Sequence, residues 1–425
     1  MSMAPALLLV VATAILAAPG AAEDGPAAAP TRTAALLAAG DEPVRVVCFG
    51  DSITGAYYHT GSMRAYCDML GFALRRLYPD AQLEMINAGI SGNTTANGLA
   101  RIERDVLSRH PHLVTVMFGI NDMNSSPAEA YRENLQELVD RCEAGGAEVL
   151  LCTPTFTTGL GSRPMSLQEA YAEAVSQVAR ASGCVVADCH HAFRRLHEEA
   201  PETHELMMSD AVHPNMNGHK LIAEVIAEAI SGREVSVADV PPPALQMRQS
   251  LTRKLHTLPL RAVAMPPYDE LLKQALDTLP GRATTLEVTT WPVEESVSAM
   301  EQWAKANIRT LRPDLVVVAV PADATGPDRS SYIASYEWIL NWSLDFGPGT
   351  WDCVPVLPSV TDPDLTAEER QWEDLARRLI AGKDLRPVER QPGDDAPALE
   401  ILTRFIQRQY EQWSLTGAAA ANVEE

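Results

Sequence analysis

Short apolar segments alternate with longer amphipathic segments from Pro43 to about Ile230, and this alternation constrains the fold more than any other feature of the chain. Each short segment ends at a glycine or a polar residue, which favours a buried strand. The longer segments carry apolar residues at three- and four-residue steps, which predicts helices with one apolar face. Strands that alternate with helices form a parallel sheet covered on both faces. The predicted strands are 44–49, 83–87, 113–118, 148–152 and 184–187.

Polar, glycine-containing segments follow the first three of these strands. Residues 50–55 follow the first strand, 87–95 follow the second and 119–122 follow the third. A further polar segment, 210–214, precedes the last helix of the alternation. Because the carboxyl ends of parallel strands share one edge of the sheet, where such folds bind their ligands, we expect these segments to meet there.

The four segments resemble, in the same order, the four sequence blocks of the GDSL, or SGNH, hydrolase superfamily. The resemblance extends over roughly residues 44–230. It implies a three-layer, flavodoxin-like SGNH-hydrolase fold with a parallel sheet, and an ester hydrolase that uses neither a metal ion nor an organic cofactor. An α/β-hydrolase is disfavoured, because no Gly-x-Ser-x-Gly motif surrounds Ser52.

The resemblance makes Ser52 the predicted nucleophile and Asp210 and His213 its catalytic partners. A serine hydroxyl is a weak nucleophile near neutral pH and needs a base to remove its proton. Histidine suits that task because its ordinary pKa lies near the working pH. Asp210, three residues before His213, can accept a hydrogen bond from the imidazole and fix its orientation.

Acyl transfer also needs donors for the oxyanion that develops in the transition state. By resemblance these are the backbone N–H groups of Ser52 and Gly92 and the side-chain amide of Asn121. Glycine at position 92 lets the backbone approach a substrate closely. Asn121 offers a neutral NH₂ donor, whereas an aspartate there would face the oxyanion with a like charge.

Four further residues are candidates for substrate binding: Asp51, Tyr57, Tyr58 and Asn93. Tyr57 and Tyr58 follow the nucleophile and could line the pocket, but packing within the Ser52 loop explains them equally well. Asn93 could shape the second oxyanion loop. Asp51 could instead bond the local backbone.

The second half of the chain repeats the pattern of the first half without its chemistry. Predicted strands begin near Leu260, Leu286, Leu315 and Val354, which we interpret as a second, diverged and catalytically incomplete α/β domain. Prolines 266–267 replace the Gly-Asp-Ser turn, and no histidine follows His256. This copy could not run the serine mechanism.

The ends of the chain and its prolines suggest domain boundaries. A short apolar run followed by small residues predicts a secretory signal peptide over 1–22, and therefore a secreted or periplasmic protein. We expect a flexible spacer over 23–42 and the catalytic domain over 43–232. A proline-containing linker over 233–259, the degenerate domain over 260–412 and a disordered tail over 413–425 complete the predicted organisation.

Charge and composition exclude several kinds of partner. The net charge of −22 argues against binding to nucleic acid or other polyanions. Beyond the first thirty residues no apolar run reaches the roughly 18 residues of a membrane span. Seven cysteines show no spacing that dictates a disulfide or metal site, so we expect them mostly as buried strand residues.

These observations predict a secreted serine esterase that cleaves carboxylic esters through an acyl-Ser52 intermediate. A small-molecule or glycan ester is the expected substrate, with a carbohydrate O-acetyl ester as the first choice. A lysophospholipase or short-chain lipase is the enzymatic alternative, and a non-enzymatic binding protein built from two such domains is the other. The sequence leaves the oligomeric state open.

Overall fold

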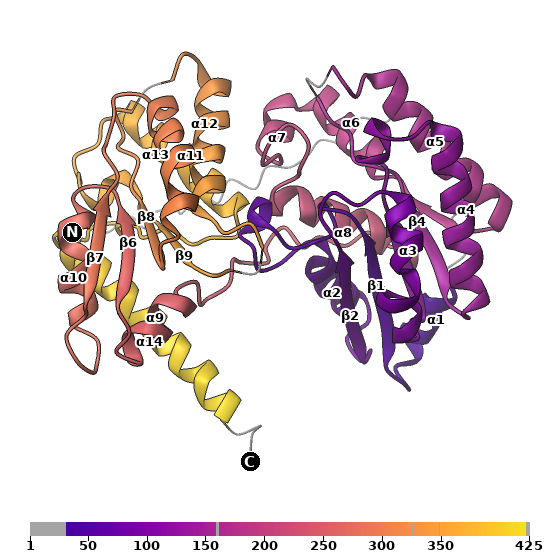
Figure 1. Ribbon diagram of the computed structural model, residues 1–425, viewed down its shortest axis with the longest axis horizontal. Coiled ribbons are helices and arrows are strands. Elements are labelled where there is room, and N and C mark those ends of the chain that lie inside the picture. Colours follow the sequence, from indigo (N-terminus) through magenta and orange to yellow (C-terminus); the bar gives the residue numbers. More distant parts are fainter. Residues whose placement is uncertain (1–30, 159–160, 325, 348, 422–425) are drawn as a thin grey trace, which may run out of the picture.

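The first half of the chain builds a five-stranded parallel sheet in the order β2-β1-β3-β4-β5 (Figure 1). The computed structural model describes residues 31–158, 161–324, 326–347 and 349–421. All five residues of β3 are buried, as expected for a central strand covered on both faces. The strands are β1 (Val44–Gly50), β2 (Leu83–Gly89), β3 (Leu113–Met117), β4 (Glu148–Cys152) and β5 (Val185–Ala187).

Helices cover both faces of this sheet, which gives three layers. One face packs against α1 (Arg32–Ala39), α2 (Tyr66–Leu77), α6 (Cys189–Glu199) and α8 (Met216–Ser231). The other face packs against α3 (Thr95–Asp105), α4 (Ala128–Ala144) and α5 (Met165–Ser182). The predicted α/β fold with a parallel sheet is confirmed.

The second half forms a separate four-stranded parallel sheet in the order β7-β6-β8-β9. In this order β6 takes the second position, as β1 does in the first sheet, with β7 in the place of β2. The second predicted α/β domain is therefore confirmed as a domain. Its elements are α9 (Arg248–Leu255), β6 (Leu260–Ala264), α10 (Tyr268–Asp277), β7 (Leu286–Thr290), α11 (Val297–Leu311), β8 (Leu315–Val318), α12 (Arg329–Ser343), β9 (Asp352–Pro355), α13 (Ala367–Gly382) and α14 (Ala398–Ala421).

Three expected irregular segments are folded instead. The spacer over 23–42 contains α1, whose Leu37 is 1% exposed in the core of the first domain. The linker over 233–259 contains α9, whose Leu251 is fully buried. The tail expected from residue 413 onward continues α14 as far as Ala421, and Trp413 donates a hydrogen bond to Thr252. The first two segments bury apolar side chains against their neighbours, which offsets the entropy cost of ordering them. In the third, Trp413 is partly buried, whereas Leu415 is 69% exposed. The expected signal peptide lies outside the described residues.

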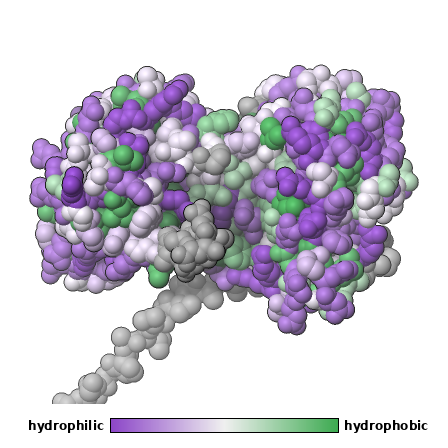
Figure 2. All heavy atoms as spheres, turned by 60° about the horizontal axis from the view of Figure 1, so that its bottom comes forward, coloured by the Kyte–Doolittle hydropathy of each residue, from purple (hydrophilic) through white to green (hydrophobic). Residues whose placement is uncertain are grey.

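The two domains pack against each other through apolar residues at the waist of the molecule. Figure 2 shows pale and green residues on the surface between the two lobes. Tyr58 and Leu206 belong to the first domain by sequence, but they pack into the apolar cluster of the second domain. Arg64 forms an ion pair with the buried Asp384 at 2.6 Å, and Ser62 Oγ donates to the carbonyl of Asp345 at 2.7 Å. The interface therefore combines apolar packing with buried polar contacts.

The seven cysteines all lie in the described part of the chain and are free; six of them are buried. Burial raises the pKa of the Cys142 thiol to about 12, so this sulfur stays protonated. Within the described residues, every helix is too short or too polar to cross a bilayer.

Candidate active site

The predicted nucleophile lies directly beyond the carboxyl end of β1, on a turn that only glycine permits. A Cβ atom on Gly50 would lie 2.1 Å from Thr54 Oγ1 and 2.3 Å from the carbonyl oxygen of Met117. Its absence lets the chain bend sharply against β3, and Ser52 then begins a turn instead of continuing the strand. Ser52 is only 4% exposed.

The structure brings Ser52, His213 and Asp210 together in one chain of hydrogen bonds. Ser52 Oγ lies 2.9 Å from His213 Nε2. His213 Nδ1 lies 3.0 and 2.9 Å from the two carboxylate oxygens of Asp210. If Nδ1 carries the ring proton, it donates to Asp210 and Nε2 is left to accept the serine proton. This is the arrangement that general-base activation of a serine requires.

Backbone groups hold the Asp210 carboxylate in place. The N–H groups of Val212 and His213 each donate to Asp210 Oδ1 at 2.8 Å. Burial opposes ionisation of this carboxyl, but the hydrogen bonds and charge of His213 outweigh it and hold the Asp210 pKa well below its usual range. The group therefore stays ionised and able to orient the imidazole.

A second imidazole, His59, lies flat against the first. Its ring is 3.8 Å from that of His213 between centroids, with an angle of 12° between the planes. Burial, together with the charge of His213, holds the His59 pKa well below its ordinary value, so the ring is neutral. From the sequence His59, like Tyr57 and Tyr58, could line the acyl or alcohol pocket or pack within the Ser52 loop. In the structure the His59 ring stacks on the His213 ring and restricts how far that ring can tilt.

His59, Asp210 and His213 are also close enough together to be considered as metal ligands. Both ring nitrogens of His213 already face hydrogen-bond partners, Ser52 and Asp210. A metal ion would have to displace one of these bonds. The donor set therefore fits proton transfer better than metal binding.

The two predicted oxyanion residues outside the nucleophile turn lie on adjacent loops. Gly92 has φ +76°, and a Cβ at this position would have no heavy atom within 4 Å, so the requirement here is the left-handed backbone. Asn121 Nδ2 donates to the carbonyl of Asn93 at 3.0 Å and lies 3.5 Å from Asp51 Oδ2. The amide of Asn121 is therefore anchored to the loop that carries Gly92.

The four candidate substrate-binding residues have different surroundings. Asp51 is 1% exposed and accepts the N–H of Ile53 at 2.9 Å, so its role is local structure; burial raises its pKa to about 7. Tyr58 is buried in the interface between the domains, so of the two roles that the sequence left open it has packing, against the second domain and not within the Ser52 loop alone. Tyr57 OH accepts the N–H of Ser91 at 2.8 Å and braces the Gly92 loop. Asn93, half-buried, accepts from Arg101 through its side chain.

The contacts of Arg101 were not predictable from the sequence. Its guanidinium donates to the carbonyls of Gly50 and Ala88 and to Asn93 Oδ1, each at 2.8 Å. One side chain on α3 thereby connects the ends of β1 and β2 with the Gly92 loop. The helical position of Arg101 gave no signal for this role, because the carbonyls it binds are brought together only by the sheet.

The second domain reaches the loop that carries Asp210. Lys383 Nζ donates to Ser209 Oγ at 2.6 Å, and Ser209 Oγ donates to Asn341 Oδ1 at 3.1 Å. Asn341 Nδ2 in turn donates to the carbonyl of Ser209 at 3.0 Å. Lys383 is also paired with Glu337, and both side chains are buried.

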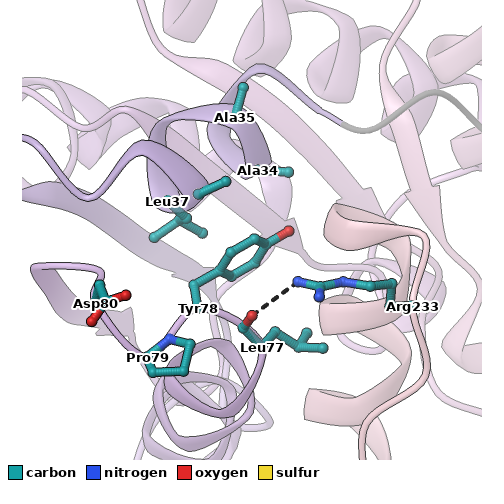
Figure 3. A pocket seen from close by; sticks show the side chains of 9 residues that line it. Ala34, Ala35, Leu37, Leu77, Tyr78, Pro79, Asp80 and Arg233 are labelled. Carbon is teal, nitrogen blue, oxygen red and sulfur yellow. Dashed lines mark hydrogen bonds between the residues drawn. The ribbon is translucent and has the colours of Figure 1, made fainter.

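A cavity of about 440 Å³ near α1 is separate from this site (Figure 3). Its wall includes Leu37, Tyr78 and Asp80, and Arg233 donates to the carbonyl of Leu77 at 3.0 Å. Asp80 precedes β2 and therefore lies toward the amino ends of the parallel strands, whereas Ser52 follows the carboxyl end of β1. The cavity in Figure 3 is thus at the end of the sheet opposite to Ser52.

The parallel α/β fold and the Ser52–His213–Asp210 arrangement together have the geometry of a serine hydrolase. The model of the GDSL-like Lipase/Acylhydrolase family matches residues 48–221. Residues 48–221 therefore form a GDSL-like domain, and this first domain is a hydrolase that acts on ester bonds.

Curated relatives include an acetylxylan esterase of Geobacillus stearothermophilus, 26% identical over 208 residues that cover 44% of this chain and 93% of that protein. An arylesterase of Vibrio mimicus is 25% identical over 205 residues, covering 46% of this chain and 92% of that protein. The crystal structure of an acetylxylan esterase from Geobacillus stearothermophilus has a TM-score of 0.40 and 27% identity, covering 46% of this chain and 97% of that one.

Proposed function

We propose that this protein is a serine esterase that cleaves carboxylic esters through an acyl-Ser52 intermediate. The observation that carries the proposal is the unbroken chain of hydrogen bonds from Ser52 Oγ through His213 to the Asp210 carboxylate. His213 accepts the serine proton as Ser52 attacks the ester carbonyl. The oxyanion forms beside Gly92 and Asn121, and donors preorganised there stabilise it without reorganisation. His213 then gives the proton to the departing alcohol, and a water molecule releases the acid by the reverse steps.

Trapping the intermediate tests this mechanism. Phenylmethylsulfonyl fluoride should inactivate the wild type and add one adduct to the peptide that contains Ser52, as read by mass spectrometry. Ser52→Ala should lose hydrolysis of p-nitrophenyl acetate and the adduct together. Ser62→Ala, another buried serine on the same loop, serves as the matched control and should keep both. An adduct at another serine, or equal turnover by the Ser52 variant, would disprove the assignment.

A small O-acyl ester on a carbohydrate is our proposed substrate. Two relatives named as acetylxylan esterases support this choice, at 26% and 24% identity. The alternative, a lysophospholipid, is supported by a relative of Escherichia coli named thioesterase 1/protease 1/lysophospholipase L1, at 24% identity. A panel of acetylated sugars, short acyl esters and lysophospholipids separates these substrates by their kcat/KM values. Highest kcat/KM for a lysophospholipid would reject the carbohydrate proposal.

We further propose that the second domain is a diverged copy of the first that has lost catalysis. The matching strand order supports this, with β6 in the place of β1. In the register of the two sheets Val44 corresponds to Leu260, so Pro266 and Pro267 fall at the places of Gly50 and Asp51, and Tyr268 falls at the place of Ser52. Secretion or export to the periplasm remains our proposal from the sequence of the first 22 residues, and detection of the mature N-terminus in a culture fraction tests it.

A further inference from the structure

A cavity of about 590 Å³ lies between the two domains, beside the predicted catalytic loop. The first domain contributes α7 (Pro201–Glu205) and residues 208–211 to its wall. The second domain contributes one side of α12, including Ile333 and Trp338. Neither domain alone encloses this space.

The cavity begins at the catalytic hydrogen-bond chain. Asp210 and Ala211 both form part of its wall. Asp210 Oδ2 lies 2.9 Å from His213 Nδ1, and His213 Nε2 lies 2.9 Å from the nucleophile oxygen. A ligand in this cavity is therefore separated from Ser52 by the short loop that connects Asp210 to His213.

The charge of the wall selects against anions. Four carboxyl side chains line the cavity, and among the described lining residues none is lysine or arginine; the four are Glu202, Glu205, Asp210 and Glu337. Glu337 is paired with Lys383 and Asp210 faces His213, so the repulsion of an anion comes mainly from Glu202 and Glu205. Asp210 is held ionised by His213. A phosphate-bearing alcohol would meet like charge here, whereas hydroxyl groups could donate hydrogen bonds to the carboxylates.

The wall also offers neutral and apolar surfaces. Burial lowers the pKa of His204 to about 4, so this imidazole is uncharged near neutral pH. His204 is 3% exposed, and its Nε2 has no hydrogen-bond partner among the described residues. Trp338 is half-buried and stacks on Trp342 at 5.4 Å, which fixes the plane of its ring. Concave sites with a rigid aromatic and a few polar groups are typical of small-molecule binding.

We propose that this cavity binds a sugar unit of the alcohol part of the ester, next to the unit that carries the acyl group at Ser52, and that this neutral, hydroxyl-rich ring is held against Trp338. The inference rests on the esterase function proposed above and assigns the second domain a direct role in substrate selection. It also favours an acetylated carbohydrate over a lysophospholipid, because the phosphate of the latter would face the lining carboxylates.

The test compares two esters that share an acetyl group but differ in the alcohol. Trp338→Ala should raise KM for an acetylated xylo-oligosaccharide by about tenfold or more with kcat within about twofold, because the lost contact is made equally in the ground and transition states. For p-nitrophenyl acetate the same variant should retain the wild-type kcat/KM. Trp338→Phe should recover most of the affinity. Trp372→Ala, at another half-buried tryptophan of this domain, is the matched control and should leave both substrates unchanged.

Several results would overturn the proposal. These are an equal effect of Trp338→Ala on both esters, an unchanged KM for the acetylated sugar, turnover of p-nitrophenyl acetate but of no acetylated sugar, or preferred cleavage of lysophosphatidylglycerol. If the wild type cleaves no ester, the proposed esterase function fails. A binding measurement then tests separately whether the cavity holds a sugar. Unacetylated xylo-oligosaccharide should then still bind the wild type in calorimetry and bind Trp338→Ala at least about tenfold more weakly. Equal binding, or no binding to either protein, would reject the cavity assignment.

Discussion

Asn121 places a neutral amide where a negative charge would oppose the reaction. Its Nδ2 atom is anchored at the Asn93 carbonyl, 3.0 Å away, so its position is set before a substrate arrives. The oxyanion that develops on the substrate's carbonyl oxygen when Ser52 attacks could accept from the same group. At the scale of single residues, the active site therefore depends on donors that are held in place by other parts of the chain.

Replacing Asn121 should affect turnover more than binding. We expect Asn121→Ala to lower kcat for p-nitrophenyl acetate by about 10²- to 10³-fold, because one preorganised donor to the oxyanion is lost. KM should stay within about twofold. Asn124→Ala, at an exposed position three residues along, is the control and should be unchanged. A loss confined to KM would remove Asn121 from the oxyanion site.

Asp51 should make stability depend on pH. Its carboxyl would ionise near 3.8 in the unfolded chain, but burial raises its folded pKa to about 7. Between these values the folded protein binds more protons than the unfolded chain, so the contribution of this group to the free energy of unfolding falls as pH rises, by at most about 1.4 kcal/mol per pH unit.

Asp51→Asn should remove this contribution, so its melting temperature should fall less than that of the wild type between pH 4.5 and about 7. Differential scanning fluorimetry at several pH values measures the difference. Asp41→Asn, at an exposed carboxyl, should follow the wild type. Parallel profiles for the Asp51 variant and the wild type would contradict the expected burial effect.

At the scale of elements, α12 and the end of α13 support the Asp210 loop from the second domain. Lys383 and Glu337 are 0% and 3% exposed in their side chains, so the pair is cut off from water. A buried charge without its partner is much more costly than a balanced pair. The Ser209 contacts thus depend on a balanced charge pair between two helices.

Lys383→Met should lower the free energy of unfolding by about 3–5 kcal/mol, because Glu337 is left buried and unpaired. The double variant Lys383→Met/Glu337→Leu should recover a large part of that loss. Urea unfolding measures both variants. Arg404→Met, which breaks the more exposed pair with Asp394, should cost about 1 kcal/mol or less. Additive losses in the double variant would show that the two charges do not depend on each other.

At the scale of the whole molecule, Tyr58 joins two cores that the sequence predicts as separate. It is 9% exposed and packs near Trp338 and Phe346 of the second domain. All seven tryptophans lie between Trp291 and Trp413, so their fluorescence reports the second domain. Hydrogen exchange of α2 and α4 reports the first domain independently.

We expect these two probes to show unfolding at the same urea concentration, because the shared interface couples the domains. Tyr58→Ala should destabilise the protein by about 3–5 kcal/mol, as for other large aromatic side chains removed from a core. The exposed Phe72→Ala, on α2 of the first domain, is the control and should cost far less. Two separate transitions in the wild type would show that the interface does not couple the domains.

The extent of sequence-based prediction follows from how local each feature is. Strands β1 and β3 were found because their apolar runs are buried on both faces. The strands β2 and β7 contain no fully buried residue and were found from shorter apolar patterns. The segments around Ser52 and His213 were found because each lies within a few residues of a strand end or a helix start. Arg101 and His59 were missed in their roles, because each acts on groups distant in sequence. The helical continuation beyond Trp413 was missed because its small residues carry no apolar stripe, and its contact with Thr252 is distant in sequence.

The sequence by itself determined two parallel α/β sheets and the chemistry that can operate at the end of β1. Periodicity and strand-end residues are local properties, so they can be read without knowing what packs where. Only the tertiary structure decided that Lys383 and Asn341 hold the Ser209 loop and that a cavity forms between the domains. These features depend on how the faces of two separately patterned sheets meet, and no repeat or spacing in the chain encodes that geometry directly.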